Sequence, residues 1–180
     1  LANGSPVTQM SVLDQAPGAP LVVADTMDLW IREQHDELMV LFKRIDGLVM
    51  NDSEAKLLTG DENLVSAGHK VLALGPRFVV IKKGEHGAMF FSQHETYVLP
   101  AYPTERVVDP TGAGDSFAGG LMGSLARSGS CDLATIRRGM IYGTVTPSIT
   151  LEKFGTEAIA KMDANSAEAR YQEFLQFVSM

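Results

Sequence analysis

Residues 109–120 read Asp-Pro-Thr-Gly-Ala-Gly-Asp-Ser-Phe-Ala-Gly-Gly, a glycine-rich turn that opens a helix. Gly112 and Gly114 can adopt backbone torsions that are closed to residues with side chains, so several neighbouring amides can point at one spot. That spot lies at a helix N-terminus, where unpaired N–H groups and the helix dipole attract an anion. Asp115 falls in the first turn of the same helix, where its carboxylate would repel a phosphate that was only being held. The position suits a base that takes a proton from a hydroxyl as it attacks a phosphoryl group.

The rest of the chain alternates between short apolar runs and amphipathic helical stretches. We expect strands at residues 21–25, 47–50 and 78–82, and helices at 29–44, 51–58, 61–74, 116–127, 133–145 and 166–178. Residues 87–91 and 96–99 are strand-like on either side of a polar turn, which predicts a hairpin. Pro147 is expected to end its helix. The pattern indicates one α/β domain over residues 1–180, with a mostly parallel sheet flanked by helices and an antiparallel hairpin at one edge.

Polar residues follow the predicted strands. Asp25, Asn51 and the Lys82–Gly84 segment each lie at or just after the end of one, and the 109–114 loop follows an extended segment. Ligands of such sheets bind at the carboxyl ends of the strands, so we expect these residues to converge on one edge. For Asp25 the simpler interpretation is a cap for the helix that begins near Leu29.

Composition excludes several classes of function. The net charge of −7 argues against a nucleic-acid partner, and no apolar run approaches the roughly 20 residues that span a bilayer. Cys131 is the only cysteine, which fits a reducing cytoplasm. The four histidines lack metal-ligand spacing, and no Gly-x-x-x-x-Gly-Lys motif of a P-loop enzyme occurs. We expect a cytoplasmic protein, and a homodimer is one assembly that the sequence allows.

Residues 108–120 resemble the C-terminal signature of the ribokinase-like (PfkB) carbohydrate and nucleoside kinases, whose core is Asp-Thr-x-Gly-Ala-Gly-Asp. The resemblance implies a Rossmann-like ribokinase fold. It also implies transfer of the γ-phosphate of ATP, with Mg²⁺, to an alcohol group of a sugar or nucleoside. Carried over to this chain, Asp115 is the catalytic base, and the amides of Gly112, Ala113 and Gly114 form the anion hole.

Two other segments, residues 51–54 and 82–87, are similar to nucleotide-binding parts of the family. Asn51-Asp52-Ser53-Glu54 resembles the Asn-x-x-Glu motif, which implies that Asn51 lies near the phosphates and that Glu54 supports Mg²⁺ through water. A helix cap is the alternative for this segment. The resemblance further implies that the residues contacting the nucleotide are Asp109, Thr111, Gly84 and Gly87.

Lys82 departs from the family pattern. The family usually has Thr-Leu-Gly-x-x-Gly where this chain has Lys82-Lys83-Gly84-Glu85-His86-Gly87. A lysine at this strand end could neutralise charge on the β- or γ-phosphate during transfer. The alternative is a solvated lysine pair beside a hairpin.

The resemblance runs from about residue 3 to residue 155 and covers only the C-terminal part of the family's usual length. The Gly-Gly-rich motif, most of the sugar-binding residues and the small β-sheet lid are not recognisable, so we expect this chain alone to be nearly inactive. Two other functions stay open: a non-catalytic nucleotide-binding or interaction module, and a hydroxymethylpyrimidine-type vitamin kinase. A NAD-dependent dehydrogenase is disfavoured because no Gly-x-Gly-x-x-Gly follows the first strand.

Overall fold

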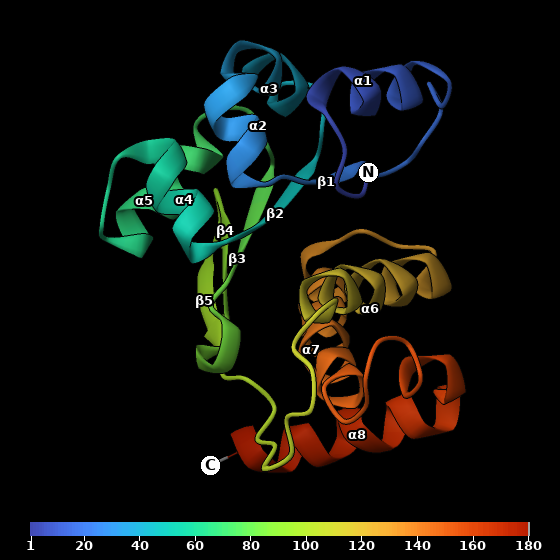
Figure 1. Cartoon of the computed structure of the whole chain (residues 1–180). Coiled ribbons are helices and arrows are strands. Elements are labelled where there is room, and N and C mark those ends of the chain that lie inside the picture. The colour runs from blue at the N-terminus through green and yellow to red at the C-terminus, as the bar shows by residue number, and fades with distance from the viewer. Residues whose placement is uncertain (180) are drawn as a thin grey trace. The chain divides into compact units, whose positions relative to one another are not determined.

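The computed structural model describes residues 1–179, which form two compact units (Figure 1). Residues 1–84 and 88–98 make up the first, here called the sheet unit. Residues 85–87 and 99–179 make up the second, the helical unit. That the whole chain acts as one domain stays a prediction. Among the described residues, no helix combines the length and apolar character needed to cross a bilayer.

The sheet unit contains five strands in the order β1-β2-β3-β4-β5. They are β1 (Val23–Asp25), β2 (Gly47–Asn51), β3 (Phe78–Lys82), β4 (Ala88–Ser92) and β5 (Thr96–Leu99). The first three strands are parallel, whereas β4 runs antiparallel to β3 with Lys82 opposite Ala88. A short turn closed by the Ser92 N–H and the Glu95 carbonyl, 2.9 Å apart, leads into β5. The predicted α/β fold, with its parallel sheet and antiparallel edge, is confirmed.

Alternation along the strands explains how the sheet packs. Leu48, Met50, Val79 and Ile81 point to one face and join a single core cluster with residues of the surrounding helices. Those helices are α2 (Asp28–Glu33), α3 (His35–Phe42), α4 (Asp52–Thr59) and α5 (Leu64–Leu72). On the opposite face, the ring of Phe90 stacks against other aromatic rings of the same sheet. The strands are therefore apolar on both faces, as the continuous runs in the sequence indicated.

Two helical features of the sheet unit differ from the sequence-based prediction. The single helix expected at 29–44 is divided, because Gln34 adopts the non-helical torsions φ −137° and ψ 44° between α2 and α3. Helix α1 (Pro6–Asp14) was not predicted. It begins with the N-cap Ser5, whose hydroxyl accepts from the Thr8 N–H. The sequence lacks the regular apolar stripe from which a helix is predicted.

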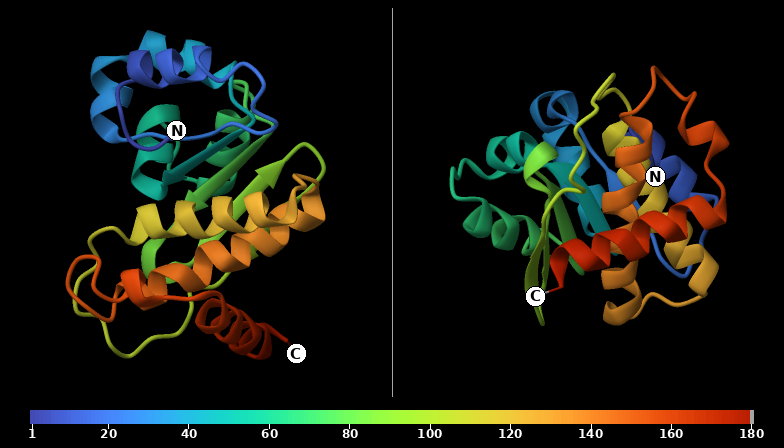
Figure 2. Two further views of the ribbon diagram at one scale, coloured as in Figure 1. Left: turned by 90° about the vertical axis from the view of Figure 1, so that its right-hand side faces the viewer. Right: turned by 90° about the horizontal axis from the view of Figure 1, so that it is seen from below.

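The helical unit contains α6 (Ala113–Ser128), α7 (Leu133–Thr150) and α8 (Ala164–Val178). A short 3-10 turn, η2 (Ile159–Lys161), precedes α8, and another, η1 (Gly84–His86), follows β3. Figure 2 shows α6 and α7 side by side. Gly120 makes this close packing possible, since a Cβ there would lie 2.5 Å from the Tyr142 carbonyl oxygen. Gly143 on α7 is similarly crowded, 3.1 Å from Phe117.

Helix α7 continues past Pro147 to Thr150, so the prediction that Pro147 ends the helix was wrong. A proline inside a helix loses one backbone hydrogen bond and crowds the preceding turn. Ser148, Ile149 and Thr150 after it are all buried. Their burial favours continuing the helix strongly enough to override the local preference of proline.

Candidate active site

The loop before α6 is held by the carboxylate of Asp109. One oxygen accepts from the Thr111 N–H at 2.9 Å and the other from the Gly155 N–H at 3.3 Å. These hydrogen bonds, led by the one from Thr111, lower the pKa of Asp109 below its usual value. Asp109 is therefore a carboxylate that ties the loop to the segment after α7.

Gly112 is the N-cap of α6 and adopts the left-handed conformation, with φ +78°. Two amides near it donate to carbonyls: Ala113 N–H to Pro110 at 3.2 Å and Ser116 N–H to Gly112 at 2.8 Å. Within residues 1–179, the amides of Gly112, Gly114 and Asp115 donate no hydrogen bond. The start of α6 thus offers a group of open amides, and Ala113, which we expected to belong to the anion hole, is the one already engaged.

Asp115 lies in the first turn of α6 and is solvent-exposed. Among the described residues its carboxylate has no hydrogen-bond or ion-pair partner. Unlike Asp109, it holds no part of the loop in place. A charged and accessible oxygen beside open amides is free to receive a proton from a bound molecule.

In the sheet unit, the parallel strands β1, β2 and β3 end at Asp25, Asn51 and Lys82, with Asn51 directly opposite Lys82. Asn51 and Glu54 form a reciprocal capping box at the start of α4. The Asn51 side-chain oxygen accepts from the Glu54 N–H at 2.8 Å, and the Glu54 carboxylate accepts from the Asn51 N–H at 2.7 Å. The cap interpretation of this segment is confirmed, and the metal-supporting role stays a prediction.

Glu54 is a buried carboxylate, 8% exposed, with a raised pKa. Burial is the largest cause, and the negative charges of Asp25 and Asp28 add to it; the hydrogen bond from Asn51 and the positive charge of Lys82 oppose it. Asp25 and Lys82 end the strands on either side of β2, and Glu54 lies in the first turn of the helix that follows β2. The three residues therefore lie at the same end of the sheet.

Asp25 does not cap α2, contrary to the sequence-based prediction. The N-cap of α2 is Met27, which makes no side-chain cap bond, and a carboxylate oxygen of Asp25 accepts from the Thr26 N–H at 2.9 Å. Its charge instead acts on Glu54. Its position at the end of a parallel strand, which the sequence already indicated, agrees with a place among the strand-end residues and not with a helix cap.

The two glycines of the turn after β3 differ in their surroundings. Gly84 has φ +55° with open space where a Cβ would be. Gly87 has φ +84°, and a Cβ there would lie 2.0 Å from the Leu99 carbonyl oxygen. Gly87 thus has a packing reason to be glycine, whereas Gly84 presents an open backbone.

The structure gathers the predicted site residues into two groups, one in each unit. Asp25, Asn51, Glu54 and Lys82 lie at the end of the sheet. Asp109, Thr111 and residues 112–115 lie at the start of α6. That the two groups form one site stays a prediction. The described residues contain no set of three or more His, Cys, Asp or Glu side chains arranged to hold a metal ion.

The family model of the pfkB family carbohydrate kinases matches residues 5–161. The chain belongs to the PfkB family. The cytidine kinase of Thermococcus kodakarensis is 33% identical over 127 residues, which is 68% of this chain and 45% of that protein. The bifunctional ribokinase/ribose-5-phosphate isomerase A of Fructilactobacillus sanfranciscensis is 35% identical over 122 residues, 65% of this chain and 22% of that protein.

Solved structures of PfkB relatives confirm the ribokinase fold. A nucleoside kinase from Methanocaldococcus jannaschii superposes with a TM-score of 0.77 at 20% identity and covers 96% of this chain. A ribokinase II from E. coli in complex with ATP and Mg²⁺ gives 0.74 at 25% identity and covers 93%. The chain spans 55% and 53% of those two structures, about half of their length.

Proposed function

We propose that this PfkB chain supplies the catalytic part of an ATP-dependent phosphotransferase that acts on an alcohol group of a sugar or nucleoside. The observation that carries the proposal is the start of α6. An exposed, unpartnered carboxylate, Asp115, adjoins the open amides of Gly112 and Gly114 at a helix N-terminus. Binding of phosphate alone would be weakened by that carboxylate, whereas phosphoryl transfer to a hydroxyl requires a base there.

In this proposal Asp115 accepts the proton of the acceptor hydroxyl while the hydroxyl oxygen bonds to the γ-phosphorus and the bond to ADP breaks. The amides of Gly112 and Gly114 donate to the oxygens of the transferring group, where charge is spread in the transition state. The amide of Ala113 completes this set if its 3.2 Å bond to Pro110 opens. The dipole of the 16-residue α6 adds a positive field at the same end.

The residues at the end of the sheet have the chemistry to support Mg²⁺, which neutralises phosphate charge when bound. Mg²⁺ prefers oxygen ligands and keeps several waters, so Glu54 and Asn51 would act through water. The charge of Asp25, which already acts on Glu54, would join them. Lys82 would add a cation at the phosphates.

The loop residues take different parts in the nucleotide site. Gly84 would contact the nucleotide through its open backbone, and Gly87 would shape the same turn. Asp109 would act mainly by fixing the loop through its two amide bonds, and Thr111 is exposed and able to contact phosphate.

Asp115→Asn tests the proposal in the full-length polypeptide that contains this chain, with ATP, Mg²⁺ and a panel of sugars and nucleosides. Loss of the base should lower kcat by about 10²- to 10⁴-fold and leave the Kd for ATP unchanged. Asp132→Asn is the matched control, because Asp132 is also an exposed aspartate at a helix start, where it caps α7 by accepting from the Thr135 N–H at 2.8 Å. It should keep full turnover.

Unchanged turnover in Asp115→Asn would refute the proposal and favour the non-catalytic nucleotide-binding module. The same panel decides between a sugar or nucleoside acceptor and a hydroxymethylpyrimidine if that compound is included. We expect the 180-residue chain alone to give no turnover. A cytoplasmic location and a homodimer stay predictions.

A further inference from the structure

Residues 148–155, which comprise the last turn of α7 and the chain after it, are hydrogen-bonded to the chain just before the glycine turn. The Val108 N–H donates to the Leu151 carbonyl at 2.7 Å. The Asp109 carboxylate accepts from the Gly155 N–H at 3.3 Å. These two bonds fix the position at which the turn begins.

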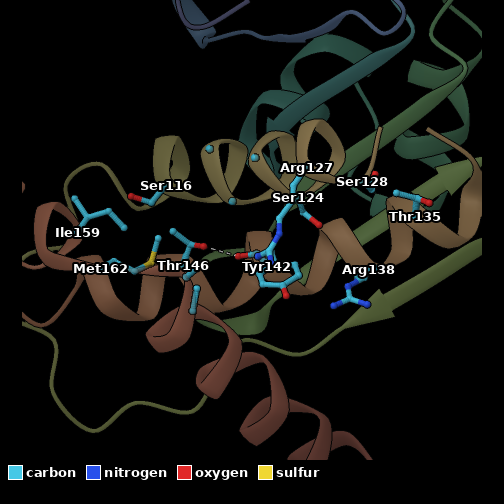
Figure 3. A pocket seen from close by; sticks show the side chains of 15 residues that line it. Ser116, Ser124, Arg127, Ser128, Thr135, Arg138, Tyr142, Thr146, Ile159 and Met162 are labelled. Atoms are coloured by element: carbon cyan, nitrogen blue, oxygen red, sulfur yellow. Dashed lines mark hydrogen bonds between the residues drawn. The ribbon is translucent and has the colours of Figure 1, made fainter. Parts of the chain in front are cut away.

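The same segment also holds the chain just after the turn. The hydroxyls of Ser116 and Thr150 lie 2.7 Å apart, and Thr150 is buried. Figure 3 shows Ser116 in the first part of α6. Ser116 directly follows Asp115, so the proposed base and the open amides lie between two attachments to residues 148–155. A shift of this segment would therefore move the proposed phosphoryl site.

Arg170 of α8 is bonded to two residues of this segment. One guanidinium nitrogen donates to the Ser148 hydroxyl oxygen at 2.7 Å, and another pairs with the Glu152 carboxylate. Ser148 is buried, and its own hydroxyl donates to the Val145 carbonyl at 2.6 Å. Arginine suits this position, because its planar fork presents separate donors to two partners in one fixed geometry.

The ring of Tyr102 supports the position of Arg170. The guanidinium lies over this ring, 5.0 Å from its centroid, where the aromatic face attracts a cation. The Tyr102 hydroxyl in turn donates to the Glu173 carboxylate of α8 at 2.5 Å. Arg170 therefore contacts both the chain that leads to the glycine turn and the segment at the end of α7.

We propose that Arg170 is a positioning residue that holds residues 148–155 and, through them, keeps the phosphoryl site in its geometry. The inference rests on the proposed function, since it concerns the placement of the same base and amides. Without the guanidinium, the Ser148 oxygen and the Glu152 carboxylate lose this donor. The segment then moves to regain hydrogen bonds with water, and both sides of the turn move with it.

Arg170→Met in the full-length polypeptide that contains this chain is the first test. Methionine can still pack on the ring of Tyr102 but donates no hydrogen bond. Misplacement of the base should lower kcat by about 10- to 100-fold. The Kd for ATP should change little, because the amides bond most strongly to the transferring group in the transition state. An unchanged kcat would overturn the proposal.

Arg138→Met is the matched control. Arg138 of α7 also contacts α8, since its guanidinium lies over the rings of Tyr142 and Tyr171 and 3.8 Å from the Glu168 carboxylate. Figure 3 shows it beside Tyr142, and it lies about 18 Å along the helix from the end of α7. Arg138→Met should lower the Tm but keep the kcat of the parent. An equal loss of kcat in both arginine variants would mean that loosening of α8 alone explains it.

Glu152→Gln is a milder second test, which stays informative if Arg170→Met folds poorly. It removes the ion pair and should lower kcat by about 2- to 5-fold. In the Arg170→Met background it should cause no further loss, because the two residues act on the segment together. Losses that multiply independently would contradict an action of Arg170 through this segment.

Hydrogen exchange separates this proposal from the kinase activity itself. The Val108 amide, which donates to the Leu151 carbonyl, reports the position of the chain before the turn. It should exchange about tenfold faster in Arg170→Met than in the parent or in Arg138→Met. The measurement needs no turnover, so it can support positioning even if Asp115→Asn fails to support the kinase. Equal exchange in all three proteins would overturn the positioning role even if Asp115→Asn abolishes turnover.

Discussion

The end of the sheet and the start of α6 carry the two groups of predicted site residues, and they are built in opposite ways. At the sheet end, Asn51 and Glu54 satisfy each other through a capping box, and Glu54 is buried. At the start of α6, the amides of Gly112 and Gly114 are open and Asp115 is exposed without a partner. The hydrogen-bonding groups of Asn51 and Glu54 are used by the fold, whereas those of Gly112, Gly114 and Asp115 are not.

This difference separates residues whose substitution should lower the stability of the fold from residues whose substitution should lower ligand binding or turnover. Changing a residue that satisfies its neighbours leaves a buried polar group behind, so the cost falls mainly on folding. Changing a residue whose groups face no protein partner removes little from the fold, so the cost falls on what it does to a bound molecule. The predictions below test whether the two groups obey this division.

Gly112→Val should have the largest effect in this set. A β-branched residue is strained at φ +78°, and adjusting the turn would misdirect the open amides, so turnover of the full-length enzyme should fall about 10²-fold or more. Gly129→Val is the matched control, because Gly129 ends the same helix with φ +66° and equally open space. Both variants should lose about 1–2 kcal/mol of unfolding free energy, but only Gly112→Val should lose turnover. Equal turnover losses would mean that strain alone explains the effect.

Lys82→Met should have an intermediate effect. Lys82 lies at the end of β3 and, among the described residues, forms no ion pair. Loss of a charged hydrogen bond to phosphate, about 1.5 kcal/mol, should weaken ATP binding about tenfold. Lys83→Met, one residue outside the strand, should bind ATP normally. If calorimetry finds the same ATP affinity for both variants and the parent, Lys82 does not contact the nucleotide.

Glu54→Gln should have the smallest effect, visible as a change in pH dependence. Burial raises the pKa of Glu54 above its ordinary value of 4.5, so the folded chain holds the proton more tightly than the unfolded chain. The stability that this proton confers is fully present below pH 4.5 and is lost as pH rises through the folded pKa. Glutamine can still accept from the Asn51 N–H but carries no charge to bury.

Urea unfolding at pH 4 and pH 8 checks the direction of this pH dependence of stability. Relative to the parent, Glu54→Gln should gain stability on going from pH 4 to pH 8. A stability difference that is the same at both values would show that the buried charge has no such cost.

Much of this organisation is readable from the sequence because local patterns and tertiary packing agree. Apolar runs predict where the strands end, and β2 and β3 do end at Asn51 and Lys82. Turn chemistry predicts a glycine turn at 112, and Gly112 is the left-handed N-cap of α6. Pro147 and Gln34 show where local rules fail. Burial of the residues after Pro147 keeps α7 helical, and a backbone break at Gln34 divides a helix whose apolar spacing is continuous.

The site was predictable in its residue types but not in its hydrogen bonding. No sequence pattern shows that the Ala113 amide is engaged while those of Gly112 and Gly114 are open, since this depends on the position of the Pro110 carbonyl. The strand pattern placed Asp25 at the strand-end edge, but no sequence pattern shows its influence on Glu54, which acts through space between β1 and α4.

The central claim is that the open amides at the start of α6 bind the phosphoryl group. Amide chemical shifts of the 180-residue chain test it most directly. On titration with ATP and Mg²⁺, the Gly112, Gly114 and Asp115 amide protons should move downfield together as they bond to phosphate oxygen. Adenosine, which has no phosphate, should leave them in place. If ATP moves other resonances and leaves these three unchanged, the start of α6 is not the phosphoryl site.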